Sequence, residues 1–460
     1  MKNRRFLLIV VSCIIFVFTI TYFNPVFAEK MDVITLSEVL ESGIVNNPEI
    51  REIELDEKNA DLDYQAARRE RFPEIDISTT YTRLEDGPEM PSIEPEIDPN
   101  TGDIIGMEFT TEEGSKDQYS TQVSLQQPIY LGGRLGLGVD IADIGRELSE
   151  VQKRQKKSEV ILEIIEAYYD VVLSQKRVEI EEEAVELARE QKRMAEANYQ
   201  AGNSLETDLL QAEIEEGEAV NSLQEARNML VIARKSLSNI AGIDDSSFQV
   251  VEPSIKPQVE LNEEKLFSKA KNKNLQIEIL NMNTEMLEKN FEMEKRSKYP
   301  NLVLQGEYGW QADEFYPDDG GSWSLTVALS SAIFDSGRSG IEREKLKNEL
   351  KKMDERKDSA IDMIELGIEN TLNSIRQKKD TIDLRKLQVE NAEENLRLQN
   401  KRYEAGMGNI LEVTAAQTVL NQTKVGLVQV EREYVVELYR LLQQTDELID
   451  FYEEVILYEM

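Results

Sequence analysis

With 460 residues and a formal net charge of −36, the chain disfavours nucleic acid and anionic lipid surfaces as direct partners. It has no histidine and one cysteine, Cys13, which excludes imidazole or thiolate metal sites and Ser-His or Cys-His catalysis. Its length would suit two or three ordinary domains, but long periodic segments favour one extended, repeated architecture.

Residues 1–28 have the composition of a secretory signal, with a basic start, an apolar stretch over 6–20 and a small-residue cleavage site ending at Ala28. The alternative is an uncleaved membrane anchor, for which the apolar stretch is short. Cleavage would remove three positive charges, changing the net charge from −36 to −39, and Cys13 would be lost as well. The mature chain would then have neither a disulfide nor a lipid-anchored N-terminal cysteine.

Two helices are predicted next. The sequence TLSE at 35–38 is a capping box that begins the first helix. Asn47-Pro48 then ends that helix and begins a second, which runs to about Arg71.

A pair of strands follows, because apolar residues alternate with small polar residues over 75–82 and again over 119–126. Pro128 indicates the end of the second strand or an irregularity in it. The proline-rich, acidic segment 85–118, whose one basic residue is Lys116, is expected to be a solvated irregular loop. A calcium site is the alternative, but the ordered ligand spacing of such sites is missing.

A long helix is predicted from the sequence LGGR at 131–134 to about Gln200, spanning roughly 100 Å. Gly202 suits the left-handed residue that ends a helix, and a return helix ends near Gly242. A seven-residue apolar repeat, typical of a supercoiled seam, precedes Gly202, and a four-three repeat follows it. These positions are Ile164, Val171, Val178 and Val185, then Ala219, Leu223, Ala226, Leu230, Ala233, Leu237 and Ile240.

The same plan then repeats. After a proline-containing linker at 243–260, helices are predicted over 261–297, strand faces over 302–310 and 323–333, and a long helix ends before Gly406. Its seam is Ile361, Ile368, Ile375, Ile382, Val389, Leu396 and Tyr403. This internal duplication predicts two structural repeats after the signal, at 29–250 and 251–460.

Four strands with one apolar and one small-polar face cannot close a barrel alone, and open edges are not tolerated in lipid. If the strands contact lipid, several protomers must share one barrel, and Trp310 and Trp323 fit an interfacial aromatic girdle. The alternative is a soluble sandwich, which helices of roughly 100 Å make awkward.

Motifs in both repeats together resemble the TolC-like outer-membrane efflux and secretion channels, over about residues 33–447. They are TLSEVLESGIVNNPEI at 35–50, FPEI at 72–75 and YPNL at 299–302, LGGR at 131–134 and DSGR at 335–338, and YQAG at 199–202 and YEAG at 403–406. The resemblance implies a mainly α fold with a small β part. Long antiparallel helical hairpins would form an α-barrel, and four strands per protomer would enter a shared twelve-stranded β-barrel in a homotrimer.

The resemblance also implies site residues. Thr207, Asp208 and Tyr403 match the periplasmic gate, Glu412 stands where an entrance acid ring is placed, and Gly202 and Gly406 mark the hairpin tips. In two places the sequence departs from the family pattern, since Gly408 replaces a gate arginine and Ala415 replaces a second acid. Because of these departures, the ion pair of the gate arginine and the second ring of acids are not expected in this chain.

The resulting hypothesis is an outer-membrane exit duct of a tripartite efflux pump or type I secretion system. Its expected partners are a periplasmic adaptor protein, an inner-membrane transporter and outer-membrane lipid, with no cofactor, no metal and no nucleic acid. The helical tunnel would lie in the periplasm. The alternatives are a periplasm-spanning coiled-coil tether or adhesin, and an enzyme. No phosphate-binding glycine loop or distinct pair of acids supports the enzyme.

Overall fold

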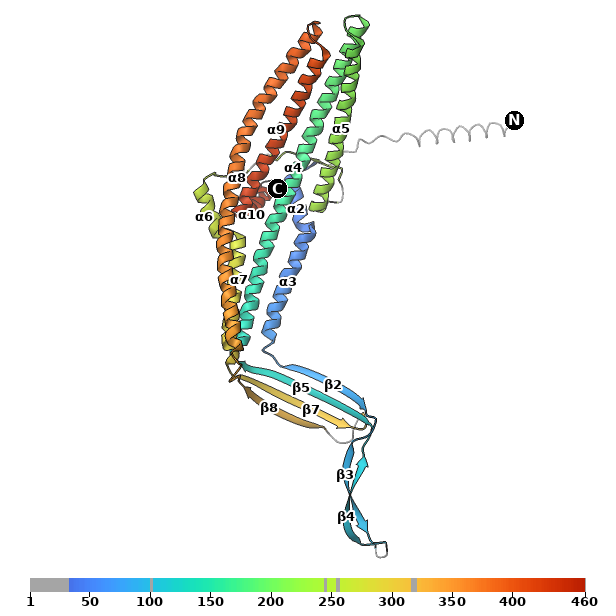
Figure 1. Ribbon diagram of the computed structural model, residues 1–460, viewed down its shortest axis with the longest axis vertical. Helices are drawn as coiled ribbons and strands as arrows, with labels where there is room; N and C mark the ends of the chain where they lie inside the picture. Colours follow the sequence, from blue (N-terminus) through green and yellow to red (C-terminus); the bar gives the residue numbers. More distant parts are fainter. Residues whose placement is uncertain (1–32, 100–101, 244–245, 254–256, 316–320, 460) are drawn as a thin grey trace, which may run out of the picture.

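The computed structural model describes residues 33–99, 102–243, 246–253, 257–315 and 321–459. The secretory signal expected over residues 1–28 lies outside these ranges. The molecule is elongated, with long helices at one end, a four-stranded sheet beyond them and a separate two-stranded hairpin at the far end (Figure 1).

The order of elements in the first half largely recurs in the second. The first half contains β1 (Val33–Ile34), α2 (Leu36–Asn46), α3 (Pro48–Arg69), β2 (Glu74–Arg83), β3 (Glu89–Ile97), β4 (Ile104–Glu113), β5 (Asp117–Leu131), α4 (Arg134–Gln200), α5 (Glu206–Ala241) and β6 (Gln249–Val250). The second contains α6 (Glu263–Lys273), α7 (Leu275–Lys295), the 3₁₀ turn η1 (Arg296–Lys298), β7 (Asn301–Ala312), β8 (Ser322–Ser330), α8 (Arg338–Glu404), α9 (Ile410–Gln444) and α10 (Leu448–Glu459).

Helices α4 and α8 each have 67 residues, and each packs antiparallel against a shorter return helix, α5 or α9 (Figure 1). Most positions of the predicted long-helix seams are buried: Ile164, Val171, Ile368 and Ile375 are at most 1% exposed. Val178, Ile361 and Val389 are half-buried. Helices α3 and α7 pack along the remaining, sheet-proximal lengths of α4 and α8. Both hairpins therefore form as the apolar repeats predict.

The strands β2, β5, β7 and β8 form one antiparallel sheet in that order. Pairing places the apolar positions on one face, since Ile77 lies opposite Val123, which lies opposite Tyr308, which lies opposite Trp323. Polar residues, small ones such as Ser78 and Ser124 together with Gln122 and Glu307, occupy the other face. The irregularity predicted at Pro128 is present as a shift of register between Pro128 and Tyr130.

Two details of the predicted strands are wrong. Strand β8 ends at Ser330, because its partner β7 begins opposite that residue, so Ile333 lies beyond the strand and is fully solvent-facing. Segment 85–118 is not an irregular loop: it holds the antiparallel hairpin β3–β4, which pairs Ile93 with Phe109 and Glu94 with Glu108. Apolar and acidic residues alternate along β3 and β4, so the hairpin has one apolar face and one acidic face.

The main core lies midway along the long helices, where α2, α4, α9 and α10 meet the short parallel pair β1–β6. Tyr168 of α4 is fully buried there, and its hydroxyl donates a hydrogen bond to the carbonyl oxygen of Val251 at 2.6 Å. Helix α10, which the sequence did not indicate, contributes Leu448 and Tyr452 to this core.

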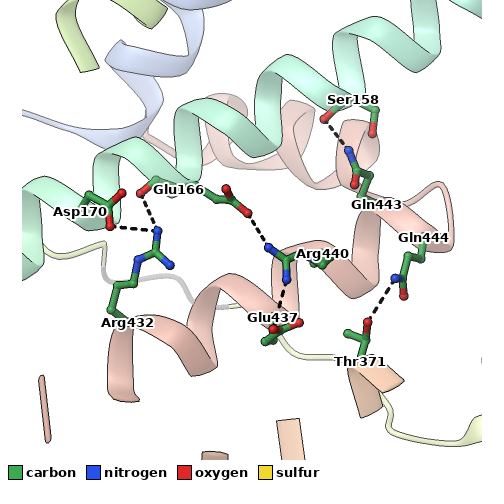
Figure 2. Close-up of polar contacts among 9 residues, drawn as sticks. All are labelled: Ser158, Glu166, Asp170, Thr371, Arg432, Glu437, Arg440, Gln443 and Gln444. Atoms are coloured by element: carbon green, nitrogen blue, oxygen red, sulfur yellow. Dashed lines mark hydrogen bonds and ion pairs between the residues drawn. The ribbon is translucent and has the colours of Figure 1, made fainter. Parts of the chain in front are cut away.

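Polar contacts join the two halves beside this core, between α4 and α9 (Figure 2). The guanidinium of Arg432 lies 2.9 Å from a carboxylate oxygen of Asp170, and Arg440 lies 2.8 Å from Glu166. The Gln443 side chain donates to the carbonyl oxygen of Ser158 at 3.4 Å. These contacts fix the position of one hairpin against the other, with both tips at the same end of the molecule.

Candidate functional site

The two hairpin tips end their long helices in the same way. Gly202 has φ +75° and Gly406 has φ +68°, the left-handed region that glycine adopts without steric cost. The amide of Asn203 donates to the carbonyl of Asn198 at 2.9 Å, and the amide of Met407 donates to that of Arg402 at 2.8 Å. Each tip is therefore a Schellman turn, which satisfies carbonyls at the end of the long helix.

The return helices begin differently. In the second hairpin the side chain of Asn409 caps α9, accepting a hydrogen bond from the amide of Glu412 at 2.9 Å. In the first, Leu205 occupies the cap position of α5 and offers no side-chain acceptor. Thr207 is exposed, and Asp208 is half-buried in the first turn of α5, where a negative charge is favourable near the positive helix end.

Tyr403 lies in a small core that joins the two hairpins near their tips and is 4% exposed. Its hydroxyl oxygen is buried and has no hydrogen-bond partner among the described residues. Burial raises the pKa of the Tyr403 phenol, the nearby side chain of Asn198 opposes this, and the charge of Asp208 raises the pKa further. No hydrogen bond joins Tyr403 to Asp208 in the described part of the chain, and the gate pair stays a prediction.

Glu412 has a partner that sequence reasoning missed. The guanidinium of Arg402 lies 3.3 Å from its carboxylate, across the tip of the second hairpin. A Cβ at Gly408 would contact the side chain of Arg402 at 3.4 Å, so the turn passes close against it. An ion pair is thus present at this tip, although Gly408 stands where the resemblance led us to expect an arginine. The signal available in the sequence was a basic residue in the last turn of α8.

Aromatic side chains gather at the end of the sheet farthest from the helices. Trp323 is 76% exposed and lies opposite Tyr308, whose ring is 6.1 Å from that of Trp310. Tyr81 and Tyr119 lie on the same face of the sheet, with ring centroids 5.0 Å apart. Trp310 and Trp323 therefore lie among other aromatic rings, and their role as an interfacial girdle stays a prediction.

Neither a metal site nor a helical membrane span emerges from the part of the chain that the structure describes. Among those residues, no group of three or more His, Cys, Asp or Glu side chains is placed to hold a metal ion. None of the helices there is both long and apolar enough to cross a membrane.

Comparison with known proteins settles the family. The model of the family described as outer membrane efflux protein matches residues 39–243 and 266–445. The chain belongs to this family. It is an efflux channel of the outer membrane, and its family consists of channels rather than enzymes.

At low identity, the chain is similar in sequence to a curated protein and in fold to solved structures. The chain is 22% identical over 316 residues to the cobalt-zinc-cadmium resistance protein CzcC of Cupriavidus metallidurans, covering 68% of this chain and 74% of that protein. The outer membrane protein VceC of Vibrio cholerae superposes with a TM-score of 0.70 at 16% identity, over 89% and 95% of the two chains. The outer membrane channel CmeC of Campylobacter jejuni superposes with a TM-score of 0.72 at 14% identity, over 90% of this chain and 86% of that chain.

Proposed function

We propose that the protein is the passive exit duct of a tripartite efflux pump, carrying solutes from the periplasm to the exterior. One observation supports this most strongly. The sheet has an exposed apolar face, a small-polar opposite face and two unpaired edge strands, β2 and β8. In lipid such edges must be paired, so strands of other protomers must complete the wall.

Three protomers, each contributing four strands, would close a twelve-stranded barrel with its apolar face toward lipid and its polar face lining the channel. Members of this family are trimeric, which supports the same count. The helices would continue the duct as a periplasmic tunnel. Its narrow end would lie at the tips, with Thr207, Asp208 and Tyr403 as the gate and Glu412 as the entrance acid.

A periplasmic adaptor and an inner-membrane transporter complete the proposed pump. Type I secretion uses the same kind of duct, and copurification of the transporter would distinguish the two assignments. The name of the Cupriavidus relative points to divalent cations as one substrate class, and the strongly acidic chain suits cation passage. A tether or adhesin would not require a sheet with an apolar face exposed to this extent.

Mass measurement in detergent and single-channel recording in planar bilayers test the proposal together. A trimer that conducts ions in steps of constant size is the expected result. A stable, water-soluble monomer that does not insert into bilayers would contradict the duct and favour the tether.

A further inference from the structure

A cationic hollow lies where α3 meets the sheet, on a chain that is otherwise strongly acidic. Its volume is about 550 Å³. Three arginines within four residues, Arg68, Arg69 and Arg71, line it together with the aromatic rings of Tyr64 and Phe72. Gln65 and Asp61 complete the lining.

None of these three arginines has an acidic partner among the residues that the structure describes. Many other arginines of the chain do form ion pairs, as Arg397 does with Glu394 and Arg440 with Glu166. Within the described part of the chain, the guanidinium groups of Arg68, Arg69 and Arg71 form neither an ion pair nor a hydrogen bond. The one carboxylate in the lining, Asp61, accepts a hydrogen bond from Gln65 at 2.7 Å.

The aromatic ring of Tyr64 orders part of this cluster. The guanidinium of Arg68 lies 5.7 Å from the ring centroid, and that of Arg146, from α4, lies 5.0 Å from it. Arg146 is itself paired with Asp143 at 2.7 Å. Tyr64 therefore holds Arg68 by a cation–π contact that leaves the donors at its edge free for a ligand.

Cations also mark the other places where the chain passes between helices and sheet (Figure 1). Arg296 precedes β7 and Arg338 follows β8, and neither forms an ion pair with a described residue. Arg134, after β5, donates to the side-chain oxygen of Asn301 at 2.8 Å. Arginines thus recur where helices meet the sheet, a set named here the arginine band, and the carboxylates of Glu74 and Asp335 lie among them.

Apolar side chains begin next to this band, on the sheet side. Phe72 is 67% exposed and Ile75, the first apolar residue of β2, is 65% exposed. In the membrane, the exposed face of the sheet would be covered by acyl chains, whose headgroups would reach the level of the band. A ligand with an anionic head and an apolar tail would match the arginines and the exposed apolar residues that lie next to them.

We propose that the hollow binds the phosphate of an anionic phospholipid in the membrane leaflet nearest the helices. Arginine guanidinium groups bind phosphate oxygens in pairs, and Phe72 would contact the first carbons of the acyl chains. The inference rests on the placement of the sheet in the outer membrane. It departs, for this location, from the expectation that the net charge disfavours anionic lipid.

Native mass spectrometry of the detergent-purified full chain, equilibrated with phosphatidylglycerol or phosphatidylcholine, tests this proposal. The wild type should retain phosphatidylglycerol in preference to phosphatidylcholine. Replacing Arg68, Arg69 and Arg71 together by glutamine should reduce that retention at least about tenfold, the effect of losing one charge-assisted hydrogen bond. The matched control replaces three exposed helical arginines away from the sheet, Arg189, Arg193 and Arg376, and should retain lipid like the wild type.

Equal retention of the two lipids by the wild type, or equal loss in the control variant, would overturn the proposal. Displacement of phosphatidylglycerol by inorganic phosphate would show a free-phosphate site instead. The same spectra report the oligomer, so a failure of the trimer is distinguished from a failure of the lipid site. If the glutamine variant does not assemble, the lysine variant at the same three positions keeps the charge and removes only the paired donors. It should bind phosphatidylglycerol less tightly than the wild type, and unchanged binding would contradict the proposal.

Discussion

Arg402 and Glu412 form an ion pair of 3.3 Å across the tip of the second hairpin, joining the last turn of α8 to the first turn of α9. Both side chains are about half exposed, so the pair contributes at most about 1 kcal/mol to stability. Its electrical effect is larger, because it places a positive charge beside the acid proposed for the tunnel entrance.

The charges of Arg402 and Glu412 should influence whether the channel prefers cations or anions. Arg402→Gln should increase the permeability ratio of cations to anions, since three uncompensated Glu412 carboxylates would then face the entrance. Glu412→Gln should lower the ratio. Reversal potentials in a salt gradient measure both, with Arg397→Gln, an exposed arginine further from the tip, as the control. Anion selectivity of the wild type, or no response to either substitution, would refute the role of Glu412.

Tyr403 is expected to contribute to stability mainly through its ring. Tyr403→Ala should destabilise the hairpin pair by about 3–5 kcal/mol, as for other buried aromatic truncations. Tyr403→Phe removes a hydroxyl that has no partner, so its free energy of unfolding should stay within about 1 kcal/mol of the wild type. Thermal unfolding measures both. A large loss in Tyr403→Phe would mean that the hydroxyl is bonded in the assembled protein.

Conductance distinguishes a gate from packing at the same residue. If the phenol bonds to Asp208 in the closed trimer, Tyr403→Phe and Asp208→Ala should each raise single-channel conductance, and the double variant should add little. Tyr199→Phe is the matched control, because Tyr199 holds the equivalent position in the first tip but is 42% exposed. Wild-type conductance in both single variants would leave Tyr403 with a packing role only.

The helices and the strands of the sheet were predictable because each shows a hydrophobic repeat within its own stretch of sequence. The seven-residue repeat through Ile368 and Ile375 predicts α8, and the alternation around Val123 predicts β5. Contacts between segments were not predictable. Arg402 and Glu412 meet only because the chain reverses at Gly406, and no local pattern reports that proximity.

The hairpin β3–β4 was missed for a different reason. Acidic residues and prolines dominate its composition, and the alternation of Ile93, Phe109 and their neighbours is visible only once the two strands are aligned. Prolines are tolerated because β3 and β4 pair only with each other, so a proline without a backbone N–H leaves no third strand unpaired. The composition of this segment therefore predicted a loop, whereas pairing between its two halves forms a β-hairpin.

Exposure of this hairpin on the cell surface can be tested directly. Glu94→Cys should react with a membrane-impermeant maleimide on intact cells, because the hairpin lies at the end of the sheet opposite the helices. Asn203→Cys, at a helical tip, should react only after the outer membrane is permeabilised. Both report cleanly since the chain's one cysteine, Cys13, lies in the expected signal. Labelling of Asn203→Cys alone on intact cells would reverse the proposed orientation.

The hairpin should also be dispensable for assembly. Gly87 and Gly114 face each other closely at its base, where a Cβ on Gly87 would collide with the carbonyl oxygen of Gly114. Removing residues 88–113 and joining these glycines should therefore leave the β2–β5 ladder intact, with Leu84 still donating to Lys116 at 2.8 Å. The trimer should persist in detergent, and its loss would show that the hairpin takes part in assembly.

Glu181 should make stability depend on pH. It is 8% exposed on α4, beside a hollow of about 400 Å³ between α4, α5 and α9. Burial raises the pKa of its carboxyl, Glu225 acts in the same direction, and Arg177 opposes them. Glu215 and Glu218 of α5 also line the hollow, and α9 presents only uncharged residues to it.

Because the folded pKa of Glu181 lies above its unfolded value, the charged carboxylate destabilises the fold above the folded pKa. Protonation relieves this as the pH falls toward the ordinary glutamate value, about 4.3. Glu181→Gln should therefore raise the melting temperature at neutral pH, and the gain should shrink steadily on acidification. Glu182→Gln, which alters an exposed neighbour paired with Arg227 at 2.7 Å, should give no such gain. A gain independent of pH would show that packing, rather than the charge of Glu181, sets the difference.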